Sequence, residues 1–265
     1  MENTAGLPLL HESDWPPDIE RIVEATRAGC RDLLDAESDR GTSISAEAAD
    51  TILGLIGIWG IPVLDLARLD PERTWLWADL HLRDAASVRG HHRPFWCRLT
   101  HDRTLRRRWR HTVRPADLMI HAGDFAPEFV DERRRRALLD ALPGRKVNIL
   151  GNHDVAAVHA PLTDGWDATF GALVIGSTPP LVVTHCPLRA VPPGAVNVHG
   201  HMHRRRDRRN DPRINVAIEQ TGYRPARASV LIAEAAHRLD GNAPRPLPEA
   251  AAQASGTGGR STPAR

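Results

Sequence analysis

The sequence predicts an α/β protein, and three observations indicate that class. Short apolar runs rich in β-branched residues recur from Thr74 onward. Polar, arginine-rich segments with helical character, at 98–111 and 127–142, separate the first three runs. The later runs follow one another without such segments between them. Strand–helix alternation that opens into consecutive strands is typical of sheets that are parallel in one part and antiparallel in another.

The first 70 residues predict helices. Apolar residues recur at helical spacing from Asp18 until Gly41, and a second helix is expected from about residue 43 or 45 to Trp59. We therefore expect a helical N-terminal extension over residues 1–70. Two roles stay open for it. It packs on the main domain, or it binds a protein partner through an apolar stripe that contains Ile52, Leu55, Ile56 and Trp59.

The main domain is expected over residues 71–239. Its strands are predicted in the runs that begin at residues 74, 117, 146, 172, 181, 195 and 213. Residues 240–265 are rich in proline, glycine, alanine and serine and show no apolar period, so they predict a disordered tail.

Composition narrows the class further. The chain has 265 residues, of which 41% are hydrophobic and 26% charged, as in ordinary folded proteins. The net charge of 35 − 33 = +2 is too small to indicate nucleic acid or an anionic membrane. Three widely spaced cysteines favour a reducing compartment, and no apolar run reaches the roughly 18 residues of a membrane span. A cytoplasmic protein without membrane contact is expected.

Five short clusters place metal-binding side chains directly after predicted strands. Ligands in open α/β sheets bind beyond the carboxyl ends of strands, so loops that lie far apart in the sequence can meet there. The clusters are Asp79-Leu80-His81, Gly123-Asp124, Gly151-Asn152-His153-Asp154, His185, and Gly200-His201-Met202-His203.

The residue types in these clusters favour metal binding. Each cluster alone has an ordinary explanation, such as a turn aspartate or a partly buried histidine. Together they supply two aspartates, one asparagine and four histidines as candidate ligands, a mixed oxygen and nitrogen set that suits zinc, iron, manganese or cobalt. Seven ligands are too many for one tetrahedral ion, but they suit two ions that share a carboxylate.

This ordered set resembles the calcineurin-like metallophosphoesterase superfamily, over roughly residues 74–232. Two further stretches, RPFW at Arg93 and NVAIEQTGYRP at Asn215, resemble a small bacterial and phage phosphoesterase subfamily. The resemblance implies a two-layer β-sandwich flanked by helices, in a four-layer αββα arrangement. One departure is that Arg83 and Asp84 stand where many relatives have Gly-His, and the nearest Gly-His in this chain begins at Gly90.

The resemblance also implies roles for the motif residues. The first metal would be held by Asp79, His81 and His203, the second by Asn152, His185 and His201, and Asp124 would bridge both. His153 would lie beside the substrate phosphate, and Asp154 would orient it. The implied activity is that of a metal-dependent phosphoric ester hydrolase. A metal-bound hydroxide attacks the phosphate ester, and His153 acts as the general acid. Two divalent ions are expected as cofactors, with manganese favoured over iron, zinc and cobalt.

Two alternatives stay open. A nuclease or a cyclic-nucleotide phosphodiesterase is supported only by the arginines at 204–209, which follow His203 directly. Nucleic acid is therefore an open substrate but not the favoured one, because residues 204–210 lack the aromatics that such a site also needs. The other alternative, from a different class, is a non-catalytic interaction module on the same fold. Such a module would be marked by missing ligands, and none is missing.

Overall fold

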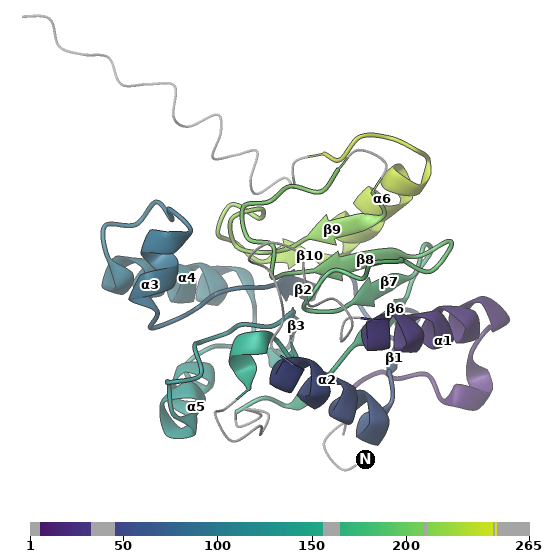
Figure 1. Cartoon of the computed structure of the whole chain (residues 1–265), viewed down its shortest axis with the longest axis horizontal. Helices are drawn as coiled ribbons and strands as arrows, with labels where there is room; N and C mark the ends of the chain where they lie inside the picture. The colour runs from purple at the N-terminus through teal and green to yellow at the C-terminus, as the bar shows by residue number, and fades with distance from the viewer. Residues whose placement is uncertain (1–5, 33–45, 156–164, 209–210, 246, 248–265) are drawn as a thin grey trace, which may run out of the picture.

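Two five-stranded sheets with helices on their outer faces make up the chain (Figure 1). The computed structural model describes residues 6–32, 46–155, 165–208, 211–245 and 247. This arrangement confirms the α/β class and the two sheets flanked by helices. Most of the tail predicted at 240–265 lies outside the described residues, as does the end of the first predicted helix, at 33–45.

One sheet has the strand order β10-β2-β3-β4-β5. Its strands are β2 (Thr74–Trp77), β3 (Leu118–His121), β4 (Arg145–Ile149), β5 (Ala168–Phe170) and β10 (Ala226–Arg227). Strands β2, β3, β4 and β5 run parallel to one another, and β10 pairs antiparallel with β2. The sequence predicted β2, β3 and β4 but not β5 or β10, which are short and lie at the two edges of the sheet.

The other sheet has the order β1-β6-β7-β8-β9. Its strands are β1 (Val63–Asp65), β6 (Leu173–Gly176), β7 (Leu181–Val183), β8 (Val196–His199) and β9 (Arg213–Asn215). Only β6 and β7 pair antiparallel in it, which confirms that the sheet system is mixed. The short edge strand β1 was not predicted.

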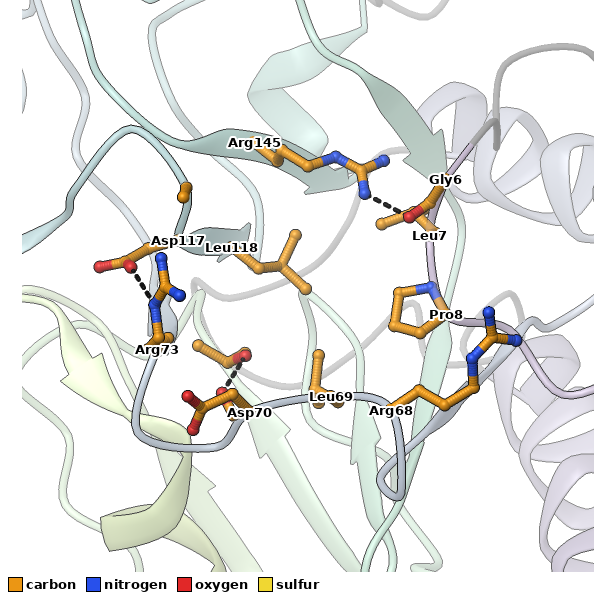
Figure 2. A pocket seen from close by; sticks show the side chains of 12 residues that line it. Gly6, Leu7, Pro8, Arg68, Leu69, Asp70, Arg73, Asp117, Leu118 and Arg145 are labelled. Carbon is orange, nitrogen blue, oxygen red and sulfur yellow. Dashed lines mark hydrogen bonds and ion pairs between the residues drawn. The ribbon is translucent and has the colours of Figure 1, made fainter.

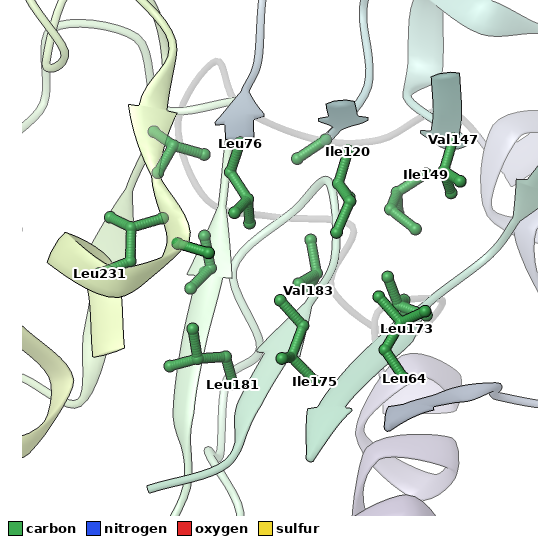
Figure 3. Packing of buried hydrophobic residues seen from close by; sticks show 14 of the residues in the cluster. Leu64, Leu76, Ile120, Val147, Ile149, Leu173, Ile175, Leu181, Val183 and Leu231 are labelled. Atoms are coloured by element: carbon green, nitrogen blue, oxygen red, sulfur yellow. The ribbon is translucent and has the colours of Figure 1, made fainter. Parts of the chain in front are cut away.

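The main core lies between the two sheets (Figure 3). Leu76 and Ile120 from one sheet and Ile175, Leu181 and Val183 from the other belong to the same buried cluster. Parallel strands that are covered on both faces need apolar residues on both sides, which explains the almost continuous apolar runs in the sequence.

Helices α1 (Pro17–Asp32) and α2 (Ala46–Trp59) pack on the outer face of the β1–β9 sheet. Val23 and Ile56 lie in one buried cluster with Val174 and Val182 of the sheet. The described part of the segment expected as an extension, residues 1–70, thus supplies two helices and also the strand β1. The side chains of Ile52, Leu55 and Ile56 are turned inward, and Trp59 remains 41% exposed.

Helices α4 (Arg98–Thr112) and α5 (Glu132–Asp140) cover the outer face of the other sheet. Trp109 of α4 packs against Trp77 of β2 with 6.3 Å between ring centroids. Helix α5 begins later than the predicted residue 127, because the Asp131 side chain accepts the backbone N–H of Arg134 and caps the helix there.

The remaining described elements are all helical. They are η2 (Glu12–Asp14), α3 (Ala85–Gly90), η3 (Asn152–Asp154) and α6 (Ala228–Leu239). Helix α6 inserts Leu231 into the core between the sheets (Figure 3). None of the helices in the described ranges is long and apolar enough to cross a lipid bilayer.

Candidate metal centre

All seven predicted metal ligands meet beyond the carboxyl ends of five strands. The loops after β2, β3 and β4 of one sheet and after β7 and β8 of the other supply them. Groups of these side chains have their ligand atoms within 4.8 Å of one another. The residues are Asp79, His81, Asp124, Asn152, His185, His201 and His203.

The first group is centred on Asp79. Its Oδ1 atom lies 3.9 Å from Nε2 of His81 and 3.7 Å from Nε2 of His203. The same Nε2 atom of His81 lies 3.6 Å from Oδ2 of Asp124. Two histidines and two carboxylates therefore aim at one small volume.

The second group is centred on Asn152. Its Oδ1 atom lies 3.0 Å from Nε2 of His185 and 3.0 Å from Nδ1 of His201. Oδ2 of Asp124 lies 3.3 Å from Nε2 of His185. Asp124 therefore contacts both groups, as a bridging ligand would.

The donor set suits cations. Ligand atoms that share one ion through bonds of about 2.1 Å lie at most about 4.2 Å apart, and the separations above are within that limit. His81 is only 2% exposed, yet neither of its ring nitrogens has a hydrogen-bond partner. Buried polar atoms almost always have a partner, so a buried imidazole without one indicates a ligand site.

The backbone of the site is held in an uncommon conformation. Five of the seven candidate ligands have left-handed backbone angles, with φ between 45° and 63°; they are Asp79, His81, Asp124, His201 and His203. Residues other than glycine seldom adopt this region, and it costs about 1–3 kcal/mol per residue when the conformation is strained. Such strain clusters at functional sites, where the surrounding structure enforces it.

Two glycines allow the close approach of the loops. A Cβ atom on Gly200 would lie 2.5 Å from Oδ2 of Asp79, and one on Gly151 would lie 2.3 Å from Oδ1 of Asp124. Any side chain at either position would therefore displace a carboxylate ligand. Glycine at both positions therefore permits the close approach of the backbone to the carboxylates.

The electrostatics of the site favour bound positive charge. Burial raises the pKa of Asp79 to about 6, although the nearby histidines oppose the shift. Burial also acts to raise the pKa of Asp124, but the charge of His185 outweighs it and holds that pKa well below its usual range. Burial lowers the pKa of His81 well below its ordinary value, which leaves the neutral imidazole that binds metals.

The tautomer of His185 suits a ligand role. Its Nδ1 atom lies 2.8 Å from the backbone oxygen of Ala122. A carbonyl oxygen only accepts hydrogen bonds, so Nδ1 carries the proton and donates. In the neutral imidazole the lone pair is then on Nε2, which faces Asp124 and Asn152. Metal-binding histidines are commonly oriented in this way.

His153 lies beside the centre, and one expectation about it needs correction. Nδ1 of His153 lies 2.9 Å from Oε2 of Glu128, and its backbone N–H donates to Oδ1 of Asp124. Asp154 does not contact the imidazole. Its carboxylate accepts the backbone N–H groups of Asp124 and Gly151 and pairs with a buried arginine at 3.0 Å. Asp154 therefore holds the loops together, and Glu128 orients His153.

Sequence reasoning did not assign roles to Arg93 and Glu219, which support the first group. Arg93 is 4% exposed, donates to the backbone oxygens of Asp79 and Leu80, and pairs with Glu219 at 2.8 Å. Oε1 of Glu219 lies 3.4 Å from Nδ1 of His203. The signal for both residues was present, because they belong to the RPFW and NVAIEQTGYRP stretches.

Two other neighbours complete the surroundings. The ring of His91 stacks on that of His203 with 3.6 Å between centroids, so the shifted Gly-His at Gly90 does reach the site. Cys186 is 4% exposed, and burial raises its thiol pKa well above the ordinary value. A buried thiol of this kind behaves as a small apolar side chain.

A hollow also lies at the opposite, amino end of the strands (Figure 2). Its wall includes Arg73, Asp117 and Arg145, together with Gly6 and Arg68. None of the seven candidate ligands lines it. The hollow therefore plays no part in the metal centre.

Comparison with known proteins adds little to this geometry. No model of a known protein family matches the chain. The chain is 32% identical over 83 residues to an uncharacterised protein, MJ1445, of Methanocaldococcus jannaschii. That match covers 31% of this chain and 47% of the relative, so the chain spans about half the length of the curated relative it matches. A solved structure, the protein of unknown function AQ665 from Aquifex aeolicus, has a TM-score of 0.47 and 20% identity. The match covers 57% of this chain and 93% of the AQ665 chain.

Proposed function

We propose that the protein is a dinuclear-metal-dependent phosphoesterase of the calcineurin-like kind. The observation that carries this proposal is the pair of ligand groups that share Asp124. Seven oxygen and nitrogen donors form two neighbouring sets, and one buried imidazole among them has no hydrogen-bond partner at either ring nitrogen. The two sheets flanked by helices support the proposal, since the resemblance implies the same layers. Manganese is the favoured ion, with iron, zinc and cobalt as alternatives.

The bound metals and the side chain of His153 would have different roles in hydrolysis. When bound, two divalent ions supply an acidified water and neutralise charge on the phosphoryl oxygens. His153 has a side chain that is 40% exposed at the edge of the centre, where a leaving group can reach it. Burial acts to lower its pKa, but the charges of Asp124 and Glu128 outweigh this and raise it. The raised pKa favours the protonated imidazole, which is placed to give a proton to the departing oxygen.

The cysteines support a reducing compartment. Cys30, Cys97 and Cys186 are all free thiols. We propose the cytoplasm as the place of action on this ground.

The test combines metal analysis with an ester screen of the full-length protein. We expect about two equivalents of divalent metal per chain, and hydrolysis of an aryl monoester, an aryl diester or a cyclic nucleotide with added manganese. Asp124→Asn should lower the metal content and abolish hydrolysis. Asp140→Asn is the matched control, because Asp140 is exposed on α5 and pairs only with Arg136, at 3.7 Å.

Two results would contradict the proposal. Full hydrolysis by Asp124→Asn would remove the shared-ligand assignment. Absence of bound metal and of hydrolysis with every divalent ion tested would favour the alternative of a non-catalytic interaction module.

A further inference from the structure

A hollow lined by arginines lies along the loop that carries two candidate ligands. It has a volume of about 400 Å³ and is lined by residues that precede β8 or lie in β8, β9 and the loop between them, including Met202, Arg205, Arg206 and Arg208. Met202 lies between the candidate ligands His201 and His203 in the sequence. The loop after β8 therefore supplies these two ligands of the metal centre and a wall of the hollow.

The acids of this hollow are already engaged, but most of its arginines are not. Asp211 pairs with Arg213 at 2.6 Å, and Asp207 pairs with Arg238 at 3.1 Å. Among the described residues, four exposed arginines of the hollow have no acidic partner; they are Arg189, Arg205, Arg206 and Arg208. The hollow therefore carries net positive charge, and a guanidinium fork suits phosphate.

The arginines of helix α5 provide a useful contrast. Arg134 pairs with Asp131 at 3.2 Å, and Arg136 pairs with Asp140 at 3.7 Å. The chain has a single lysine, so arginine is its general basic residue and its abundance alone indicates nothing. Unlike these two arginines, the four arginines of the hollow named above have no acidic partner among the described residues, and they gather at one hollow.

A second hollow, of about 530 Å³, lies at the connection between α3 and α4. Trp96 in its lining is 96% exposed, and Leu99 is 67% exposed. Arg89 and Arg98 also line it, as does Arg93, which donates to the backbone oxygen of Asp79. Arg93 therefore connects this hollow to the loop of a candidate ligand, and the hollow presents an exposed aromatic ring among basic groups.

The two loops that line these hollows touch each other beside a candidate ligand. Nη1 of Arg204 lies 3.4 Å from the backbone oxygen of His92, and His92 lines the second hollow. The neighbouring His91 stacks on the candidate ligand His203. We call the residues that these two loops carry, Trp96, His92, Arg204, Arg205 and Arg206, the arginine–tryptophan track.

We propose that the substrate is a single-stranded nucleic acid that lies along this track, an inference that rests on the proposed phosphoesterase function. Proteins bind single strands by combining a positive groove for the backbone with exposed aromatic rings on which bases stack. The arginines of the first hollow would hold backbone phosphates, Trp96 would stack on a base, and one phosphodiester between them would face the two ligand groups.

The reaction would be hydrolysis of that diester. Water supplies the oxygen that forms the new bond to phosphorus, and the bond from phosphorus to the departing sugar oxygen breaks. His153 gives its proton to that sugar oxygen, and the proton that the attacking water loses is returned through solvent to the imidazole. No oxidant or further co-reactant is needed.

The test compares a short oligomer with a small diester, using the full-length, manganese-loaded protein. The probes are thymidylate and uridylate oligomers of about 12 nucleotides and bis(nitrophenyl) phosphate, with kcat/KM measured at several salt concentrations. The uridylate and thymidylate arms distinguish RNA from DNA. We expect the oligomer reaction, unlike the small-diester reaction, to slow steeply as salt rises.

Two variants probe the two halves of the track. Arg205→Gln combined with Arg206→Gln should lower kcat/KM on the oligomer at least about tenfold more than on the small diester. It should also reduce the salt slope by about 1.4, or about 0.7 for each lost phosphate contact. Trp96→Ala should lower the oligomer rate about 5- to 100-fold, and Trp96→Phe should retain most of it. Metal content and thermal stability are measured for every variant.

Matched controls lie elsewhere on the surface. Arg133→Gln combined with Arg134→Gln removes two exposed arginines from α5, and Trp59→Ala removes an exposed ring from α2. Neither control should distinguish the oligomer from the small diester. An equal loss in the controls would show that net charge alone matters and would overturn the track.

The remaining outcomes separate this inference from the function it rests on. Hydrolysis of the small diester without hydrolysis of either oligomer overturns the inference and leaves the phosphoesterase standing. Failure to bind metal and to cleave any ester overturns the phosphoesterase itself. An unchanged oligomer rate in Trp96→Ala, with loss of self-association in sedimentation, would assign Trp96 to a protein contact and overturn the track.

Discussion

The two ends of the parallel strands differ in how their buried polar groups are hydrogen-bonded. At the amino end, Asp117 is 3% exposed and accepts hydrogen bonds from the side chains of Arg73 and Trp75 and from the backbone of Arg114 (Figure 2). At the carboxyl end, His81 is similarly buried and neither ring nitrogen has a hydrogen-bond partner. The buried carboxylate at the amino end is thus satisfied within the fold, whereas this imidazole is not, as expected of a side chain that binds a ligand.

The aspartates at the two ends differ in the same sense. Burial acts to raise both pKa values. At Asp117 three donors outweigh burial and lower the pKa, whereas at Asp79 burial prevails and raises the pKa to about 6. Left-handed backbone angles at residues other than glycine also occur at Asp79 and its neighbours but not at Arg73, Trp75 or Asp117. The amino end therefore satisfies its buried charge within the fold, whereas the carboxyl end gathers the candidate ligands.

The largest effect on hydrolysis within this comparison is expected from His153→Gln. General acid catalysis is worth about 10²–10⁴ in rate. The variant should keep both metals and lose that factor on alkyl esters, whose leaving oxygen needs a proton, but lose much less on nitrophenyl esters. Glu128→Gln should show a milder version, because Glu128 holds the imidazole at 2.9 Å. Metal analysis and rates on both ester types decide the matter, and equal losses on both would exclude the role.

A smaller effect is expected from Glu219→Gln, which acts through His203. Burial acts to raise the pKa of Glu219, but the hydrogen bond from His203 and the charges of Arg93 and His203 outweigh burial and lower the pKa to about 2. The carboxylate is therefore ionised. Loss of such a supporting group typically weakens metal binding about 10- to 100-fold. Metal titration should show this loss for one of the two ions. Glu128→Gln is the control, because Glu128 contacts His153 and should leave both affinities unchanged.

The smallest effect on hydrolysis is expected at the amino end, from Asp117→Asn. The variant should bind both metals normally but lose about 1–3 kcal/mol of the free energy of unfolding at pH 7, since an amide cannot accept all three donors. The folded-state pKa of Asp117 is lowered, so its stabilisation is present above the unfolded pKa of about 3.9 and is lost as the pH falls through the folded value.

Denaturant unfolding at several pH values checks this prediction. The difference between the two proteins should be full at pH 7 and should shrink below about pH 4. A loss of metal in Asp117→Asn would show that the two ends are not independent.

The candidate ligands could be predicted because each follows a strand signal. Strong apolar runs such as TWLW and LMIH mark the strands, and Asp79 and Asp124 follow these two runs closely. The role expected for Asp154 was wrong because adjacency in the sequence does not determine hydrogen-bond partners. Its carboxylate bonds to the loop of Asp124 across 30 residues, and Glu128 reaches His153 across 25.

The sequence by itself determined the α/β class, the positions of the main strands along the chain and the identity of the candidate ligands. These features depend on local periodicity and residue type. Only the tertiary structure decided which residues surround the candidate ligands. Arg93 and Glu219 lie 126 residues apart and meet beside Asp79, and Arg204 meets His92 across 112 residues. In the proposed track, the aromatic ring missing from residues 204–210 would come from Trp96 on another loop, which is exposed. Contacts between distant segments depend on how the two sheets pack, and no local pattern in the sequence records that packing.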